Sequence, residues 1–321
     1  MRPALKSGLL PVWRDQDTIQ IGIDARRAVA LSGMRQAAIF IGLLDGSRDR
    51  SRLIADAVAH GIPEAVSERI LTLLAAGGAL DDYPAGTWRA LPGPLRTRLA
   101  AELATASLAH GDGDGGAGFL ARRRGATVRI EGERRVGRLI ARVLAASGVG
   151  QVRFRSSLAG PSASGGQAPE DGRSARGHLA ILIGHVGLDR ADALVRAGIP
   201  HLAVTAGEAI GVVGPLVVPG FSACLRCMEY TRAARDPAWP LILAQLAARR
   251  AEPPACDAVL ATAVAAQAAA QALTALDRFP AAGAAVNGTI ELVLPDWRWR
   301  RRSWQPHPAC VCTGRRTPPD S

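Results

Sequence analysis

Lysine, cysteine and a leading apolar segment are what this sequence lacks or has little of. Lys6 is the only lysine, so the formal charge of +11 comes from arginines that are spread along the chain. That pattern indicates a GC-rich coding bias rather than a dedicated nucleic-acid surface, and an acidic peptide partner fits the same charge equally well. The five cysteines fit a reducing cytoplasm with a metal site better than a disulfide framework. Residues 2–10 contain no apolar core of the length that a secretory signal needs, so we expect a cytoplasmic protein.

The composition is that of an ordinary globular protein. At 321 residues, 48% hydrophobic and 21% charged, the chain can fold into two domains with separate cores. The most apolar helical segment, Asp257 to Asp277, is rich in alanine and carries Gln267 and Gln271. Those polar residues favour a packed core helix, and we expect no membrane-spanning segment.

A strand–helix–strand pattern from Thr127 to Ser156 organises the second half of the chain. Val128 and Ile130 alternate with other residues, as they do in a strand. A helical stripe with the spacing i, i+3, i+4, i+7 and i+8 follows, made of Val136, Leu139, Ile140, Val143 and Leu144. Gly148-Val149-Gly150 ends the helix, and a second strand begins. The pattern predicts an α/β domain with a Rossmann-like parallel sheet.

The turn between the first strand and the helix carries an altered nucleotide-binding fingerprint. In the intact pattern G-x-G-x-x-G, the middle glycine lets the backbone approach a phosphate at the helix N-terminus. Gly132 and Gly137 keep the outer positions, but Arg134 occupies the middle one. The carboxylate expected after the second strand is also missing, because the chain there is Arg155-Ser156-Ser157. The turn therefore predicts the fold together with a degenerate nucleotide site.

Residues 1–83 form a separate unit by their pattern. Val12-Trp13-Arg14, a polar turn and an isoleucine alternation over residues 19–23 predict a hairpin, and Ala28 to Leu31 predicts a third strand. Three helices are predicted next, at Arg35 to Leu44, Asp49 to Ala59 and Pro63 to Ala76. On the last helix we expect Val66, Ile70, Leu73 and Leu74 to form one face, and Gly77-Gly78 to end the helix. Three strands followed by three helices predict a small α+β domain of the winged-helix type.

This unit resembles the PqqD-like peptide-binding domains, also called RiPP recognition elements, through IQIGID, AVALSG, RQAAIFIGLLDGS and RILTLLAAGGALDD. The resemblance implies that a precursor's leader peptide adds beside the third strand, clamped by the third helix, with Val29, Leu31 and Arg69 as candidate contacts. Strand addition needs only an open sheet edge. A DNA-binding winged helix and a structural cap are the alternatives. Arg69 is the only cation of the third helix, whereas DNA recognition needs several.

Further elements are predicted along the rest of the chain. Residues 84–125 are predicted as a connector, with a helix at Leu95 to Leu108 and a glycine-rich break before a second domain at 126–321. The Ser-, Gly- and Pro-rich segment Ser156 to Gly177 predicts an exposed or mobile loop. The remaining predicted strands are His178 to Gly184, Pro200 to Thr205, Ala209 to Val218 with a break at Gly214-Pro215, and Thr289 to Leu294; helices are predicted at Asp189 to Ala197 and from Pro240 onward.

The segment from Thr127 to Thr313 resembles the ThiF/MoeB family through AASGVGQV, GVVGPLVVPGFSACLRC, CDAVLATAVAAQAAAQAL and HPACVC, in this order. The resemblance implies a fold that adenylates a carboxyl terminus with ATP and binds zinc through four cysteines. The ATP residues do not carry over. The family's Cys-Thr-Asp falls near Gly184-His185-Val186, and Lys6, the only lysine, lies in the other domain. Adenylation needs cationic clamps and a metal-binding carboxylate, so we do not expect this chain to use ATP or Mg²⁺.

The cysteines pair at both ends of the second domain. Cys224 and Cys227 form a C-x-x-C knuckle, and Cys310 and Cys312 form a second close pair. If the fold brings the pairs together, the four thiolates complete a tetrahedral zinc site. Four protein ligands leave no position for water, so such a zinc is structural. Buried free thiols and a redox-active C-x-x-C pair are the alternatives.

Other side chains in this domain have open roles. Cys256 precedes a predicted helix start, which lowers a thiol pKa, so it is either a nucleophile or an inert thiol. His307 is either a further ligand or a surface histidine. A basic-aromatic cluster is formed by Trp297, Trp299 and Trp304 with Arg298, Arg300, Arg301 and Arg302. It fits a nucleic acid or an acidic peptide, or, as we prefer, a strand edge with cation–π packing beside the zinc site.

A peptide-clamping domain joined to a degenerate ThiF-like domain resembles the partner proteins of azole-forming RiPP pathways, the TOMM pathways. The resemblance implies a scaffold that binds the leader peptide and delivers the precursor to a separate YcaO-type cyclodehydratase. That enzyme uses ATP to cyclise Cys, Ser or Thr side chains. The alternatives are an active ThiF-type adenylyltransferase and a zinc-stabilised winged-helix DNA-binding protein. The ThiF likeness also implies pairing of two copies into a homodimer.

Overall fold

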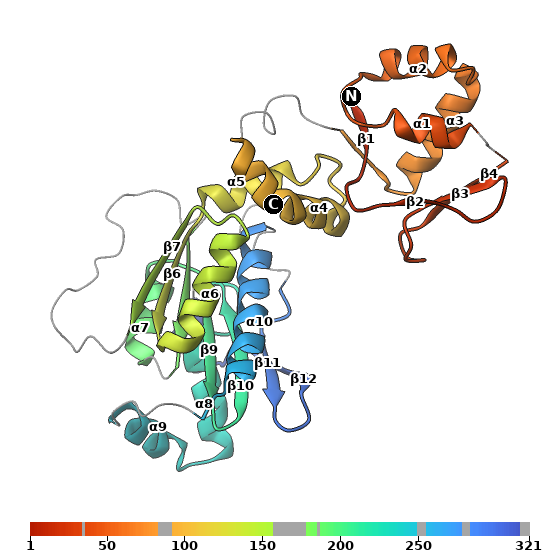
Figure 1. Ribbon diagram of the computed structural model, residues 1–321. Coiled ribbons are helices and arrows are strands. Elements are labelled where there is room, and N and C mark those ends of the chain that lie inside the picture. The colour runs from red at the N-terminus through yellow and green to blue at the C-terminus, as the bar shows by residue number, and fades with distance from the viewer. Residues whose placement is uncertain are drawn as a thin grey trace. The chain divides into compact units, whose positions relative to one another are not determined.

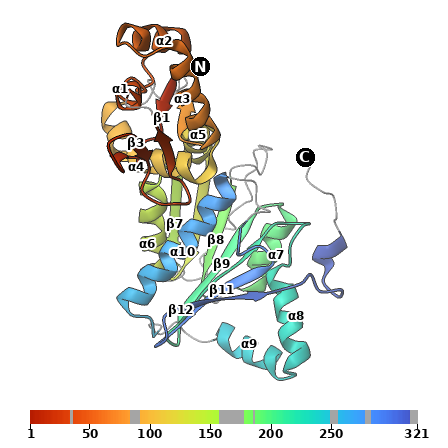
Figure 2. The same cartoon turned by 90° about the vertical axis from the view of Figure 1, so that its right-hand side faces the viewer.

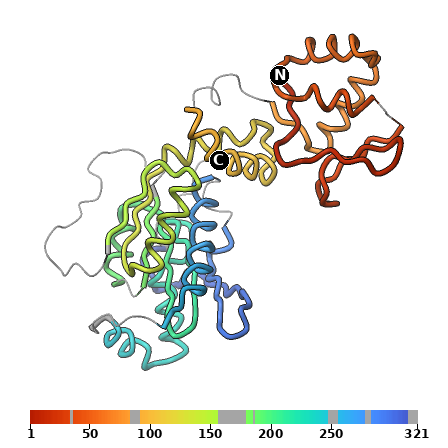
Figure 3. The backbone as a smooth tube through the Cα atoms, viewed as in Figure 1, coloured from red at the N-terminus to blue at the C-terminus, as the bar shows by residue number. Residues whose placement is uncertain are grey.

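The computed structural model describes residues 1–33, 36–82, 92–156, 178–184, 187–248, 255–277 and 283–314 (Figure 1). The chain divides into two compact units, Met1–Ala121 and Arg122–Ser321, whose paths can be followed in Figure 3. Apart from Ser156, the loop predicted at 156–177 lies outside the described residues. The same is true of residue 83, of 84–91 in the predicted connector, and of His185-Val186.

The first unit contains the predicted hairpin, third strand and helices. An antiparallel sheet has the order β2-β3-β4, with strands at Pro11–Trp13, Thr18–Ile21 and Val29–Ser32. Three helices follow, α1, α2 and α3, at Ala37–Gly42, Arg50–Ala59 and Glu64–Ala76. A second, two-stranded sheet is not evident from the sequence: β1 (Pro3–Leu5) pairs antiparallel with β5 (Leu80–Asp82). The winged-helix class of this unit stays a prediction.

Helix α3 buries a face slightly different from the predicted one. Ile70 and Leu74 are fully buried as expected, but Leu71 is 5% exposed and Leu73 is 37% exposed. The buried stripe passes through positions 67, 70, 71 and 74, which turns Leu73 to its flank. Arg69 lies four residues earlier, so it shares that flank with Leu73. Leu73 therefore lies beside the buried stripe that contains Ile70 and Leu74, and Leu71 takes its place in the core.

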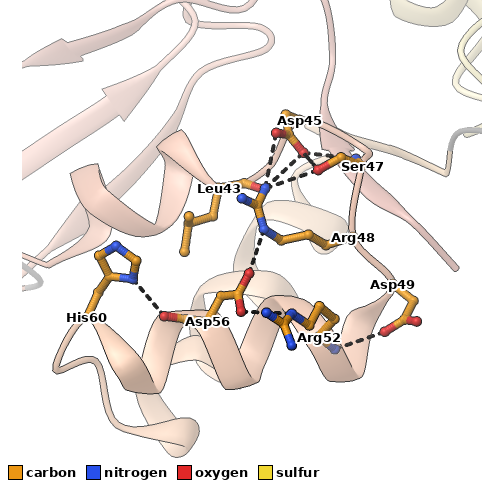
Figure 4. Close-up of polar contacts among 8 residues, drawn as sticks. All are labelled: Leu43, Asp45, Ser47, Arg48, Asp49, Arg52, Asp56 and His60. Atoms are coloured by element: carbon orange, nitrogen blue, oxygen red, sulfur yellow. Dashed lines mark hydrogen bonds and ion pairs between the residues drawn. The ribbon is translucent and has the colours of Figure 1, made fainter.

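The loop before α2 is fixed by the polar side chains shown in Figure 4. Asp49 caps α2, because its carboxylate accepts a hydrogen bond of 2.8 Å from the backbone N–H of residue 52. The Arg48 guanidinium donates to Asp56 of α2 at 2.8 Å and to Asp45 at 3.0 Å. The same guanidinium donates to the carbonyl oxygen of Leu43 at 3.3 Å. These contacts anchor the end of α1 to α2.

Helix α4, at Gly93–His110, packs within the first unit. Beneath it lies the chain's only lysine: the Lys6 ammonium donates to the carbonyl oxygen of Ser107 at 2.8 Å and lies 3.7 Å from the Asp81 carboxylate. Ser107 Oγ donates to the same carboxylate at 2.7 Å. Lys6 and Asp81 are 3% and 2% exposed, so this ion pair is buried. It ties α4, which the sequence places in a connector, to both strands of the small sheet. The short helix after it, α5 at Ala117–Gly125, has no counterpart among the predicted elements.

The second unit is built on a seven-stranded mixed sheet with the order β12-β11-β10-β9-β8-β6-β7. Its parallel part consists of β6, β7, β8 and β9, at Thr127–Gly132, Gln151–Ser156, His178–Ile183 and His201–Gly207. Antiparallel strands complete it, β10, β11 and β12, at Ile210–Val217, Gly288–Val293 and Arg298–Ser303. Strand β10 is continuous, with a register shift where the sequence predicts a break. The sheet fits the predicted Rossmann-like α/β fold.

Two helices, α6 (Arg134–Ala146) and α10 (Ala258–Asp277), lie side by side on one face of this sheet (Figures 1 and 2). The core below them includes Ile130, Ile140 and Val264. By length and composition α10 could cross a membrane, but it packs into this core, as its glutamines lead us to expect. On the other face, α7 (Leu188–Arg196) covers β8 through Ala191 and Leu194.

Candidate functional site

The four cysteines of the two pairs converge, as the sequence predicts. Cys224 caps α8 (Leu225–Arg235) and Cys227 lies in its first turn, whereas Cys312 lies in a short 3₁₀ turn at Val311–Gly314. All four sulfur atoms lie within 4.8 Å of one another. The shortest separations are 3.7 Å for Cys224–Cys227, 3.5 Å for Cys224–Cys310 and 3.4 Å for Cys227–Cys312. The cluster can therefore hold a single metal ion.

The donor set fits a tetrahedral, thiophilic dication. A Zn–S bond of about 2.3 Å in a tetrahedron places the sulfur atoms about 3.8 Å apart, close to the separations found here. The Cys224 thiol donates a hydrogen bond to Cys227, which lowers the pKa of Cys227 to about 4 and raises the pKa of Cys224. Burial raises the pKa of Cys312 to about 12. Thiolates this close repel one another, so a dication is what allows all four to ionise.

The surroundings of the cluster hold it in place. Ala223 precedes the knuckle, and its backbone N–H donates to Asn287 Oδ1 at 2.8 Å. Trp304 is buried in the same apolar cluster as the cysteines, and its indole N–H donates to Thr289 Oγ1 at 3.0 Å. The guanidinium carbons of Arg232 and Arg302 lie 5.4 Å and 5.7 Å from the ring centroid of Trp304. The expected cation–π packing beside the cysteines is therefore present. The ring of His307 packs at a tilt of 34° against Tyr230, with 5.1 Å between the ring centroids, and His307 is not among the four residues of the cluster.

The altered nucleotide turn is closed by a carboxylate of the chain itself. Gly132 has a φ of +127°, and a Cβ there would lie 2.0 Å from the Ile183 carbonyl oxygen, so this glycine is required by the packing of β6 against β8. Glu133 caps α6: its carboxylate accepts hydrogen bonds from the backbone N–H groups of residues 135 and 136. Arg134 is exposed at the first helical position, and Gly137 lets α6 approach Phe154. The N–H groups that hold a phosphate in an intact site are thus bound to Glu133.

Glu133 is a residue of this turn that the sequence interpretation did not single out. An acidic residue between a glycine turn and the start of a predicted helix is a signal for an N-cap. This signal would have identified Glu133 from the sequence. The Glu131 carboxylate, two residues earlier, is also engaged, because it is paired with Arg190 of α7.

Cys256 lies near this turn and apart from the other cysteines. It is 7% exposed, and burial together with the charge of Glu133 raises the pKa of its thiol. Its carbonyl oxygen accepts a hydrogen bond of 2.7 Å from the Arg135 guanidinium. Asp257, rather than Cys256, caps α10 by accepting a hydrogen bond of 2.7 Å from the N–H of residue 260. The helix start therefore does not activate this thiol.

Strand β4 is an edge strand of its sheet in the described part of the chain. The Gly33 N–H donates to the carbonyl oxygen of Asp17, which directly precedes β3, and the antiparallel alternation then directs the backbone groups of Val29 and Leu31 toward β3. The N–H and C=O groups of Ala30 and Ser32 consequently point to the free edge. Leu31 is fully buried in the core, so its side chain is not a peptide contact.

Helix α3 runs close to this edge. A Cβ at Gly77, next to the end of α3, would lie 2.2 Å from Val29 Cγ2. Leu73 and Arg69 precede Gly77 by four and eight residues, so all three share the flank of α3 that faces β4. Arg69 is exposed, and Leu73 offers apolar surface there.

Most of the basic-aromatic cluster lies on β12, which carries Trp299 and the four arginines, whereas Trp297 and Trp304 flank the strand. All six residues of β12 are exposed. The Arg301 guanidinium is occupied by the chain itself, because it donates to the carbonyl oxygens of Ala284 at 2.8 Å and Val286 at 3.1 Å. Trp297 and Trp299 are each 42% exposed. In the part of the chain that the structure describes, β12 is the last strand of the sheet on its side, as the predicted strand edge requires.

No protein-family profile and no curated protein matches the sequence. Solved structures do match. One is Escherichia coli MccB in a structure with AMPCPP and MccA: it is 13% identical over 98% of this chain and 100% of that chain, with a TM-score of 0.64. MccB, a microcin C7 biosynthetic enzyme, also matches in a structure with N-formylated MccA. The heterocyclase TruD is 14% identical over 97% of this chain and 42% of that chain, with a TM-score of 0.66. A heterocyclase in complex with substrate and cofactor is 13% identical over 94% of this chain and 38% of that chain, with a TM-score of 0.63.

These likenesses establish the fold. MccB matches over its whole length, so both units of this chain have counterparts in one protein, whereas the chain spans less than half of the two heterocyclases. The resemblance to the ThiF-like proteins and to the TOMM heterocyclase partners, drawn from the motifs above, is thereby confirmed at the level of the fold.

Proposed function

We propose that this chain is a leader-peptide-binding partner of a YcaO-type cyclodehydratase in azole- or azoline-forming RiPP biosynthesis. The observation that carries the proposal is the free edge of β4 beside α3 in the first unit. The chain captures the leader of a precursor peptide there and presents the precursor to the separate cyclising enzyme. A structural zinc in the cysteine quartet supports the second unit.

The peptide adds to the sheet through its backbone. Ala30 and Ser32 offer outward N–H and C=O groups, which pair with an incoming strand in the same way as an internal neighbour does. Both residues are exposed, so nothing in the described part of the unit covers them. The flank of α3 adds side-chain selectivity, because Leu73 provides an apolar contact and Arg69 a positive charge. A leader that binds here therefore needs a strand-forming segment with at least one apolar and one acidic residue.

In this proposal the chain itself neither binds nor hydrolyses ATP. The Glu133 carboxylate takes the N–H groups at the start of α6 and adds negative charge where a phosphate would bind. The neighbouring Arg134 is a bulky residue at the position where an intact turn has glycine. ATP consumption therefore falls to the cyclodehydratase.

The structural neighbours support a peptide partner. MccB was solved with N-formylated MccA, and one heterocyclase was solved with its substrate and cofactor. The heterocyclases are more than twice as long as the part that matches this chain. A separate cyclodehydratase acting with this chain would supply the activity that those longer proteins contain, and homodimerisation is a further expectation of the same proposal.

The test compares two substitutions at one residue of the β4 edge. Ala30→Pro removes an outward N–H and leaves the bonds to β3 intact, whereas Ala30→Val keeps that N–H in a strand-favouring residue. Fluorescence anisotropy would measure the affinity of each full-length protein for a labelled synthetic peptide with a strand-forming segment that carries an apolar and an acidic residue. We expect Ala30→Pro to weaken binding at least tenfold and Ala30→Val to bind as the wild type does. Equal affinity of all three proteins would overturn the proposal.

A second candidate is an active ThiF-type adenylyltransferase, which the ATP- and AMPCPP-bound structures of MccB favour. It requires ATP–pyrophosphate exchange in the presence of a peptide that carries a free carboxyl terminus. Exchange by the zinc-loaded wild-type protein, lost in a variant of the turn such as Arg134→Ala, would establish it in place of the scaffold role.

A further inference from the structure

Helix α6 carries a positive charge that nothing on the helix balances. Its 13 residues include Arg134, Arg135, Arg138 and Arg142, and no aspartate or glutamate. Arg134, Arg138 and Arg142 are exposed and recur every four residues. With a rise of about 1.5 Å per residue, the three guanidinium groups share one face and extend over about 12 Å.

The three arginines also have no partner among the residues that the structure describes. Neither a hydrogen bond nor an ion pair engages Arg134, Arg138 or Arg142 there. Two other helical arginines of this unit are paired, Arg190 of α7 with Glu131 and Arg226 of α8 with Asp192. Unpaired arginines also occur singly on α7 and α8, at Arg196 and Arg235, so what distinguishes α6 is that three of them share one helical face.

Helix stability does not account for this arrangement. The N-terminus of a helix carries a partial positive charge, so Arg134 at the first position of α6 opposes the helix dipole. The carboxylate nearest in sequence, Glu133, is bound to the backbone N–H groups of the helix and does not neutralise the arginine face. Among the described residues, no carboxylate forms an ion pair with this face, so it is open to negative charge from another molecule.

We propose that the arginine face of α6, formed by Arg134, Arg138 and Arg142, is a docking surface for an acidic polypeptide segment. Carboxylates on every second residue of an extended peptide repeat every ~6.6 Å, and those on every fourth residue of a helix every ~6 Å. Both spacings match the ~6 Å between successive arginines of the face. The surface lies on the second unit and acts independently of peptide capture at β4.

A polypeptide fits this face better than a single-stranded nucleic acid does. Sequence-independent binding of single strands combines cations with exposed aromatic rings on which bases stack. No aromatic residue is present in α6, and Val143, 38% exposed, is the apolar residue beside the arginines. The partner is therefore recognised by carboxylates and a small apolar contact.

The experiment measures binding of fluorescein-labelled octaglutamate to the full-length, zinc-loaded protein at low ionic strength. The variant R134Q/R138Q/R142Q removes the face, and R196Q/R235Q/R298Q removes the same charge from three other exposed arginines of the unit. We expect the first variant to lose about threefold to 100-fold in affinity, from three exposed ion pairs, and the second to lose less than about twofold. R134K/R138K/R142K should retain binding. Similar losses in both glutamine variants would overturn the proposal.

Two further measurements keep the result independent of how the variants fold. Hydrogen exchange of the wild-type protein should slow in residues 134–146 when octaglutamate is added, and protection elsewhere without protection there would contradict the proposal. Unlabelled octathymidylate should compete less well than unlabelled octaglutamate. A stronger competition by the oligonucleotide would assign the face to nucleic acid and overturn the polypeptide assignment. Loss of peptide capture at β4 would leave both outcomes unchanged.

Discussion

Replacing Cys310 with serine removes one sulfur ligand from the quartet and leaves the remaining chemistry of the second unit intact. The expected effect follows from what the metal joins. Cys224 and Cys310 are 86 positions apart, and their sulfur atoms lie 3.5 Å from each other. A metal ion bound by both segments therefore cross-links the chain and closes a loop of about 86 residues.

The size of the effect can be taken from the entropy of closing this loop. A cross-link across about 86 residues stabilises a fold by between about 4 and 5 kcal/mol at 25 °C in the chain-entropy treatment. In a unit with the extent of Arg122–Ser321, about 1 kcal/mol shifts the Tm by about 2–4 °C. Cys310→Ser should therefore lower the Tm of this unit by about 10–20 °C, together with loss of bound metal.

Scanning calorimetry and metal analysis by mass spectrometry would measure both quantities. Cys256→Ser is the matched control, because Cys256 is buried but lies outside the quartet, and it should keep one zinc per chain. A chelator should bring the wild-type Tm down to that of Cys310→Ser. If the chelator strips the metal and the Tm stays within about 2 °C of the untreated value, the metal does not hold the two segments and the reasoning is wrong.

Three other predictions concern single positions. A Cβ at Gly150 would lie 1.9 Å from the Arg124 carbonyl oxygen, so Gly150→Ala should cost about 3 kcal/mol or more in urea denaturation, whereas Gly125→Ala, with open space around it, should cost less than about 1. Glu133→Ala removes the cap of α6 and should lower the unfolding free energy by about 1 kcal/mol; an unchanged value would show that the cap contributes nothing. Burial lowers the pKa of His201 to about 4 from an ordinary 6.5, so the unfolded chain takes up the proton first. Stability should fall as the pH drops from about 6.5 to 4, and a series on His201→Leu should show a flatter slope.

Features with strong local signals could be predicted from the sequence. The α6 stripe and its flanking strands repeat with the two periods that distinguish helix from strand, and the cysteine pairs are separated by spacings that metal sites use. Both were found where the pattern placed them. The whole sheet brings the two cysteine segments together, which the sequence does not show. A zinc site with four thiolates nevertheless requires two more ligands for each cysteine pair, so the sequence already indicated that the pairs meet.

Features set by tertiary contacts could not be predicted in this way. Strands β1 and β5 have three residues each, too few to show a period, and they lie far apart in the sequence. On α3, Leu71, Leu73 and Leu74 offer two equally apolar faces, and only the packed core decides that Leu73 stays outside. Helix α8 begins at Leu225, between the two cysteines of the knuckle, and the C-x-x-C pattern there gives no sign that a helix begins.

The buried pair of Lys6 and Asp81 gives this chain an unusual chemical property. Reagents that acylate amines find no lysine side chain on the surface, because the only one is 3% exposed and bonded to Ser107. Acylation of Lys6 then requires the first unit to open around β1, β5 and α4. The rate at which a mild acylating reagent modifies Lys6 therefore reports how often the first unit opens locally. A ligand that stabilises this unit should lower that rate.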